Sequence, residues 1–154
     1  MKIRWTFKKE VCRETTDSSL EEACGRLRLW RIVIADDVVY FRTLLRYALD
    51  PKKFEVVGEA GDGAEAIEQV RTQRPDALIL DLSMPVMDGL QAIPQIRKDA
   101  PETKILVLSG FDAVAMADQA MKLGAHSYLE KGIEIEDISD ALTALCEGDQ
   151  RPIE

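Results

Sequence analysis

The chain has 154 residues, of which 46% are hydrophobic and 31% are charged, a composition that suits one compact globular domain with its own core. It holds no apolar run of membrane-spanning length and no signal-peptide core at its start, so we expect a cytoplasmic protein that does not enter a membrane. The net charge of −8 argues against nonspecific nucleic-acid binding, and the three widely spaced cysteines, Cys12, Cys24 and Cys146, argue against a disulfide framework or a zinc site.

The charge is unevenly distributed along the chain. Residues 1–31 hold eight Lys and Arg against five Asp and Glu, a net charge of +3 that leaves −11 for residues 32–154. This change in the sign of the net charge predicts a domain boundary near residue 30. We expect residues 1–29 to be a mobile N-terminal extension, residues 30–148 the folded domain and residues 149–154 a tail. The alternative is an ordered extension, with a half-buried strand in KIRWTFK and a capped helix that starts at Ser18 or Ser19.

From residue 31 onward, apolar β-branched runs alternate with segments of helical spacing. This pattern predicts strands at 31–36, 53–60, 76–81, 104–110 and 127–131, and helices at 38–49, 64–73, 89–99, 112–124 and 134–148. Pro94 should kink or shorten the third helix, and Gly124 should cap the fourth. Such alternation predicts an α/β fold, a doubly wound five-stranded parallel sheet with five helices that cover both faces.

Polar residues follow the carboxyl ends of four of these strands. Asp36 and Asp37 end the first strand, Asp81 the third and Ser109 the fourth, and Lys131 closes the fifth. Ligands of parallel α/β sheets bind at this edge. Three converging carboxylates repel one another unless a cation joins them, and Mg²⁺ prefers oxygen ligands, whereas a lysine and a hydroxyl suit a phosphoryl group. The set therefore predicts a metal-assisted phosphoryl transfer with Asp81 as nucleophile. The alternative is that each residue merely ends a strand or caps a helix.

The segments that carry these residues resemble a known family. IVIADD, LILDLSMPVMDG, LVLSG and SYLEKG together are similar to a bacterial response-regulator receiver domain, the phosphoacceptor of two-component systems, over roughly residues 30–148. The spacing also fits, with 44 residues from Asp37 to Asp81 and 22 from Ser109 to Lys131. The segment YLEKGI is most similar to the corresponding segment in receivers of LuxR-type regulators. The resemblance implies the flavodoxin-like receiver fold and a signalling protein rather than an enzyme.

The resemblance also implies a phosphorylation and metal site. Asp81 would accept a phosphoryl group from a sensor histidine kinase or a phosphotransfer protein. Asp37 would bind Mg²⁺ directly and Asp36 through water, with Asp81 and the backbone carbonyl of Ser83 as further ligands. Lys131 would contact a phosphoryl oxygen. Phosphorylation would therefore depend on Mg²⁺.

Other positions match the switch of the family. Ser109 would donate a hydrogen bond to the phosphoryl group, and Tyr128 matches the aromatic switch residue. The surface formed by the fourth helix, fifth strand and fifth helix would then change, and it is a possible homodimer face. Phe111, two residues after Ser109, would shield the aspartyl phosphate from water, and the alternative is that it merely packs against the start of the fourth helix. A role in transcription regulation is implied, although the chain itself is not expected to bind nucleic acid.

Two features depart from the family pattern. Gly132 follows Lys131 where the family usually has proline, which puts in doubt the cis peptide bond of that loop. The chain also ends six residues after Gly148 without a helix-turn-helix half. We expect either a stand-alone receiver or one whose output half has been removed.

The main rival interpretation is a dinucleotide-binding oxidoreductase fragment. Gly61, Gly63 and Ala66 match GxGxxG/A between a strand and a helix, and Asp81 follows at the spacing of a ribose ligand. This interpretation leaves the other strand-end residues without a role, and turn formation explains the glycines equally well. A haloacid-dehalogenase-type phosphatase would need a second acid two residues after Asp81, where Ser83 stands.

Overall fold

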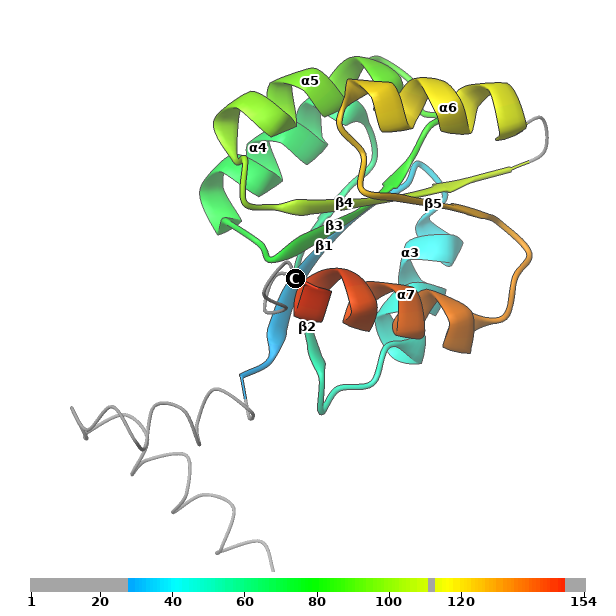
Figure 1. Ribbon diagram of the computed structural model, residues 1–154. Coiled ribbons are helices and arrows are strands. Elements are labelled where there is room, and N and C mark those ends of the chain that lie inside the picture. The colour runs from blue at the N-terminus through cyan, green and yellow to red at the C-terminus, as the bar shows by residue number, and fades with distance from the viewer. Residues whose placement is uncertain (1–27, 111–112, 149–154) are drawn as a thin grey trace, which may run out of the picture.

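The computed structural model describes residues 28–110 and 113–148, which Figure 1 shows in colour. The expectations for the N-terminal extension, for Cys12 and Cys24, for Phe111 and for the C-terminal tail lie outside the described residues. Among the described residues, no helix is long and apolar enough to cross a membrane.

Ten helices and strands alternate along the described chain. The strands are β1 (Trp30–Ala35), β2 (Phe54–Ala60), β3 (Ala77–Asp81), β4 (Lys104–Ser109) and β5 (Ser127–Glu130), and the helices are α3 (Val39–Ala48), α4 (Gly63–Gln73), α5 (Gly89–Asp99), α6 (Ala113–Leu123) and α7 (Ile135–Glu147). Each element begins and ends within one residue of its predicted bounds. The hydrophobic periods were sufficient to locate these elements because each element buries one or both of its faces.

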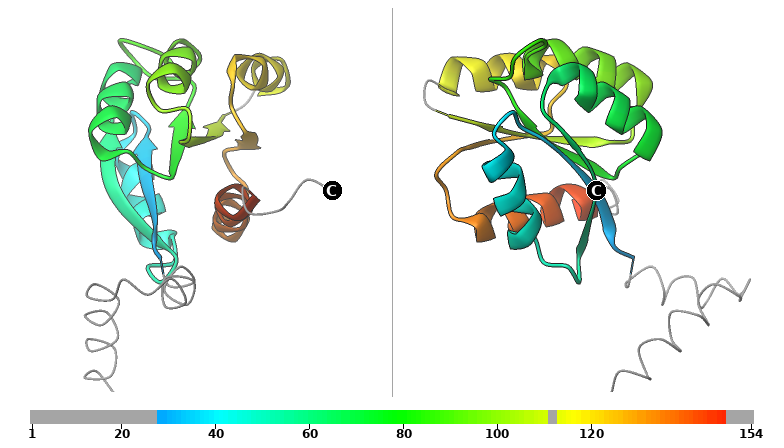
Figure 2. Two further views of the ribbon diagram at one scale, coloured as in Figure 1. Left: turned by 60° about the vertical axis from the view of Figure 1, so that its left-hand side comes forward. Right: turned by 180° about the vertical axis from the view of Figure 1, so that it is seen from behind.

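The five strands form one parallel sheet in the order β2-β1-β3-β4-β5. Helices α4, α5 and α6 cover one face of the sheet, and α3 and α7 cover the other (Figures 1 and 2). This arrangement confirms the predicted α/β class and the doubly wound, flavodoxin-like topology. Because the order reverses direction at β1, the crevice at the carboxyl ends of β1 and β3 is the expected binding position of such a sheet.

Alternate side chains of the central strands pack into two separate cores. Val33 and Leu78 join α4 and α5 in one core, whereas Ile32 and Ile79 join α3 and α7 in the other. Cys146 is buried in the second core, and burial raises the pKa of its thiol to about 12. It therefore stays a neutral thiol that serves as a small apolar residue of a helix.

Two helix predictions have different outcomes. Pro94 does not shorten its helix, because α5 runs from Gly89 to Asp99, and the other predicted outcome, a kink, stays a prediction. Pro94 is exposed, so the carbonyl that loses its donor can be hydrated. Gly124 follows the end of α6 with φ +118, and the N–H of Ala125 donates to the carbonyl of Ala120 at 3.0 Å. This is the expected left-handed glycine cap.

Candidate functional site

Four of the predicted site residues lie at the carboxyl-terminal edge of the sheet. Asp36 directly follows β1, Asp81 and Ser109 are the last residues of β3 and β4, and Lys131 directly follows β5. Asp36, Asp81 and Ser109 are three of the four buried polar or charged residues in the described part of the chain. Buried ionisable groups destabilise a fold unless they are paired. Their partners therefore decide what this edge can do.

Lys131 joins the two buried carboxylates. Its Nζ atom lies 2.5 Å from Asp36 Oδ2 and 3.1 Å from Asp81 Oδ2. The same ammonium lies 4.7 Å from the centre of the Phe41 ring, which comes from α3. The backbone N–H of Lys131 donates to the carbonyl of Ser109 at 2.6 Å, which extends the pairing of β4 with β5. The lysine is thus held by contacts on three sides, with its charge directed at the acidic residues.

Three carboxylates cluster at this edge. One oxygen from each of Asp36, Asp37 and Asp81 lies within 4.8 Å of the others. Asp36 and Asp81 are buried, whereas Asp37 is exposed and opens the cluster to solvent. Such an oxygen-only set, with access to water, is what Mg²⁺ requires, because this ion keeps part of its hydration shell. The donor set therefore fits the predicted metal, and Asp36, Asp37 and Asp81 are the side chains that can hold it.

Burial and charge perturb two of these groups. Burial is the main cause that raises the pKa of Asp81, and the nearby Asp36 carboxylate adds to it, while Lys131 opposes both. For Lys131, burial lowers the pKa, but the contacts with Asp36 and Asp81 outweigh burial and raise it. Lys131 therefore stays positively charged at neutral pH. A cation bound beside Asp81 would favour its ionised, nucleophilic form.

Close backbone packing holds the loop that follows Asp81. A Cβ atom on Gly89 would lie 2.3 Å from the Asp81 carbonyl oxygen, and the Gly89 N–H donates to the Leu82 carbonyl at 3.1 Å. Asp88 caps α5, since its side chain accepts a hydrogen bond from Gln91 N–H at 2.8 Å. Asp88 and Gly89 therefore allow the chain to turn tightly behind Asp81 into α5. Ser83 is exposed, and its N–H lies 3.3 Å from Asp81 Oδ1.

The same loop contains a strained residue. Val86 has φ +65 and is 89% exposed. The N–H of Met87 donates to the carbonyl of Pro85 at 2.7 Å, so Val86 is the central residue of a γ-turn. A β-branched residue at positive φ is a genuine outlier. The strain therefore lies five residues after Asp81, at the rim of the site.

Ser109 and Tyr128 lie on the same face of the sheet. Val107 of β4 pairs with Tyr128 of β5, and Ser109, two residues further along β4, points to the same side as Val107. Tyr128 is half-buried and packs against the core beneath α4 and α5, and its buried hydroxyl has no hydrogen-bond partner among residues 28–110 and 113–148. The aromatic side chain is thus already turned inward beside the strand that carries Ser109.

The backbone conformation after Lys131 explains why glycine stands at this position. Gly132 has φ +109, which proline cannot adopt because its ring holds φ near −65°. The described residues contain no cis peptide bond. The departure from the usual lysine–proline pair therefore belongs to a different path of the chain out of β5.

Two residues that contact the site, Phe41 and Arg42, were not identified from the sequence. Phe41 had the spacing of a core residue, yet its ring faces Lys131. Arg42 donates from NH1 to the Asp36 carbonyl at 2.5 Å and from Nε to Glu59 at 3.0 Å. The only available signal was the position of Phe41 and Arg42 one turn after the acidic pair. That spacing does not specify which side chain turns back toward the sheet.

The glycines of the rival dinucleotide motif have other roles. The Gly61 N–H donates to Glu65 at 2.7 Å, which closes the turn before α4. Gly63 donates to the Met87 carbonyl at 2.8 Å, and a Cβ on Gly63 would lie 2.7 Å from that oxygen. The loop that contains Met87 and Asp88 therefore occupies the space where a pyrophosphate would have to approach. The oxidoreductase alternative is not supported.

The comparisons with known proteins agree with this geometry. The family model described as the response regulator receiver domain matches residues 32–143. The chemotaxis protein CheY of Thermotoga maritima is 36% identical over 112 residues, which are 73% of this chain and 93% of that protein. The transcriptional regulatory protein PdtaR of Mycobacterium tuberculosis is 38% identical over 112 residues, and the match spans only 54% of its length.

A solved receiver structure is also similar to this chain. The signal receiver domain of NarL from Mycobacterium tuberculosis is 35% identical, with a TM-score of 0.74 over 79% of this chain and 98% of that one. The family model covers well over half of the chain, and the fold and the order of the motifs agree with it. The chain therefore belongs to the response regulator receiver domain family of two-component signalling proteins.

Proposed function

We propose that this receiver accepts a phosphoryl group on Asp81 from a phosphohistidine of a sensor histidine kinase or a phosphotransfer protein, in a reaction that depends on Mg²⁺. One observation carries the proposal. Asp81 is a buried carboxylate at a strand end, 3.1 Å from a lysine ammonium and within a cluster of acids that is open to solvent. A purely structural ion pair would not need a second and a third carboxylate at the same point.

The residues of the site divide the chemistry among them. An oxygen of Asp81 forms a bond to phosphorus while the bond between phosphorus and the donor imidazole nitrogen breaks. Mg²⁺, when bound, would neutralise part of the charge on the transferred group. We assign Asp37 to direct contact with the ion, Asp36 to contact through water and the Ser83 carbonyl to a further ligand position. Lys131, already charged and directed at Asp81, would move onto a phosphoryl oxygen.

Intact mass spectrometry after incubation with acetyl phosphate and Mg²⁺ tests the phosphoacceptor. We expect the wild type to gain one phosphoryl group and Asp81→Asn to gain none. Asp62→Asn is the matched control, because Asp62 caps α4 and asparagine caps helices equally well. Equal labelling of wild type and Asp81→Asn would refute the assignment.

The metal roles have a separate test. Asp37→Asn should weaken Mg²⁺ binding more than Asp36→Asn, because we place only Asp37 in direct contact with the ion. A Mg²⁺ titration followed by NMR measures both affinities. If both variants bind Mg²⁺ as the wild type does, the acidic cluster has another purpose.

The output would be a change of the surface formed by α6, β5 and α7. Ser109 would move toward the phosphoryl group, and the inward position of Tyr128 would then be stabilised. Met116 and Met121 of α6 are 41% and 44% exposed, which suits a partner or homodimer face. Lys131→Ala should still be phosphorylated, yet should lose the change in dimer affinity or chemical shifts. An undiminished response in Lys131→Ala would show that the lysine does not couple the site to this surface.

The curated relative PdtaR is named as a transcriptional regulatory protein. We extend this role to the present chain as the regulation of transcription through a partner or a further domain. We also propose that the receiver spans residues 30–148, which the apolar pattern and the match over residues 32–143 support.

A further inference from the structure

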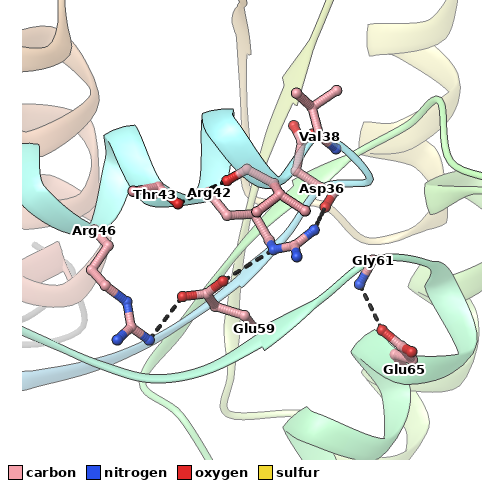
Figure 3. Close-up of polar contacts among 9 residues, drawn as sticks. Asp36, Val38, Arg42, Thr43, Arg46, Glu59, Gly61 and Glu65 are labelled. Carbon is pink, nitrogen blue, oxygen red and sulfur yellow. Dashed lines mark hydrogen bonds and ion pairs between the residues drawn. The ribbon is translucent and has the colours of Figure 1, made fainter.

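The backbone of the acidic pair is held by an arginine that belongs to α3 (Figure 3). NH1 of Arg42 donates to the backbone carbonyl oxygen of Asp36 at 2.5 Å. The Arg42 side chain is only 15% exposed, so this contact is shielded from water. A buried hydrogen bond from a charged donor is stronger than one between neutral groups. Arg42 therefore restrains the peptide group that joins Asp36 to Asp37.

A carboxylate on β2 holds the arginine in place. Glu59 Oε2 lies 3.0 Å from Arg42 Nε, and Glu59 Oε1 lies 2.8 Å from Arg46 NH2, as Figure 3 shows. Glu59 thus uses both oxygens to bridge two arginines that stand one helical turn apart on α3. The pairing compensates the charge of Arg42 and leaves NH1 directed at Asp36. Arg46 is 48% exposed and contacts the outer oxygen of Glu59.

The remaining atoms of Asp36 are fixed as well. Its N–H donates to the Ala60 carbonyl at 3.0 Å, and its Oδ1 accepts from Val38 N–H at 2.8 Å. A peptide group is planar, so holding the Asp36 carbonyl sets the direction of the Asp37 Cα atom. Asp37 itself is exposed. The orientation of its carboxylate thus depends strongly on this peptide plane.

From this geometry we infer that Arg42 is a positioning residue for cation binding: through the Asp36 carbonyl it holds the Asp36–Asp37 peptide so that both carboxylates converge with Asp81. The inference rests on the proposed metal-dependent function. It adds a residue outside the acidic cluster whose role is geometric.

Electrostatics and positioning predict opposite effects. A positive guanidinium beside an acidic cluster repels a divalent cation, so its removal should tighten Mg²⁺ binding if charge alone matters. If Arg42 positions the acidic pair, its removal should weaken binding instead. Arg46 offers the matched control, since it carries the same charge, pairs with the same Glu59 and lies on the same helix.

Mg²⁺ titrations of wild type, Arg42→Gln, Arg46→Gln and Arg42→Lys, followed by amide NMR, test the inference. We expect Arg42→Gln to raise the dissociation constant about tenfold, which is the size of effect typical of residues that orient metal ligands. Arg46→Gln should bind as tightly as the wild type or more tightly. Arg42→Lys keeps the charge and loses the forked geometry, so we expect an intermediate loss.

A second readout needs no metal. In metal-free protein, the amide signals of Asp37 and Val38 should shift in Arg42→Gln and Arg42→Lys and stay near their wild-type positions in Arg46→Gln. Thermal unfolding establishes which variants are folded, and Arg42→Lys decides the matter if Arg42→Gln does not fold. Unchanged amide signals with wild-type or tighter Mg²⁺ binding in folded Arg42 variants would overturn the inference. A wild type that does not bind Mg²⁺ would instead refute the metal dependence in the proposed function, while the metal-free amide shifts would still test the positioning.

Discussion

Replacing Val86 by glycine should stabilise the domain, although it removes a whole side chain. Val86 has φ +65 and is 89% exposed. The left-handed conformation destabilises a residue with a side chain by about 1–2 kcal/mol, which glycine would relieve. Against this gain, glycine adds conformational entropy to the unfolded chain, worth about 0.4–1 kcal/mol. The small buried part of the valine contributes only about 0.2 kcal/mol. The expected net gain is about 0.5 kcal/mol.

Urea unfolding of Val86→Gly and of Val39→Gly measures this effect. Val39 is also exposed, by 62%, but lies in the first turn of α3 with ordinary helical geometry. There the same exchange relieves no strain, so we expect a loss of about 1 kcal/mol from helix propensity and lost contacts. The two variants should therefore shift the unfolding midpoint in opposite directions. A destabilised Val86→Gly, with a loss as large as that of Val39→Gly, would refute the claim of strain.

Three further predictions concern the site. Burial raises the pKa of Asp81 above its ordinary value, so the folded state binds this proton more tightly than the unfolded state. In metal-free protein, this group should make the wild type less stable as the pH rises from its unfolded-state pKa of 3.8 through its folded-state pKa. Asp81→Asn should not show this loss of stability with rising pH. Urea unfolding of both proteins at several pH values measures it, and parallel pH profiles of the two unfolding free energies would contradict the prediction. Phe41→Leu should lower the free energy of unfolding by about 1–2 kcal/mol and remove the ring-current shift of the Lys131 side chain in NMR spectra. Tyr40→Leu is the control, because Tyr40 is 75% exposed, and it should change neither quantity. Equal effects of the two substitutions would refute the specific contact between Phe41 and Lys131. Tyr128→Phe should raise the free energy of unfolding by about 1 kcal/mol, because the buried hydroxyl has no partner in the described part of the chain. A clear loss of stability in thermal unfolding would show that the hydroxyl is hydrogen-bonded.

The sequence by itself determined the helices, the strands and the edge at which the site lies. Strands buried on both faces read as continuous apolar runs, and each amphipathic helix shows its own period, so all ten elements were predictable to within one residue. The right-handed crossover rule then brings the carboxyl ends of parallel strands to one edge. The meeting of Asp36, Asp81, Ser109 and Lys131 at that edge follows from these local and topological rules.

Only the tertiary structure decided which partner each side chain takes. Lys131 and Asp36 are 95 residues apart in the chain, and nothing in the local pattern of either predicts that the ammonium lies nearer to Asp36 than to Asp81. The turn of Arg42 toward a backbone carbonyl likewise depends on Glu59 of a distant strand. The loop that contains Val86, with its positive φ, is held to α4 because the Gly63 N–H donates to the Met87 carbonyl. Helix and strand periods arise from the repeating geometry of the backbone, which a short segment carries within itself. Side-chain pairing and strained turns arise from packing, which exists only once the whole sheet and its helices have assembled.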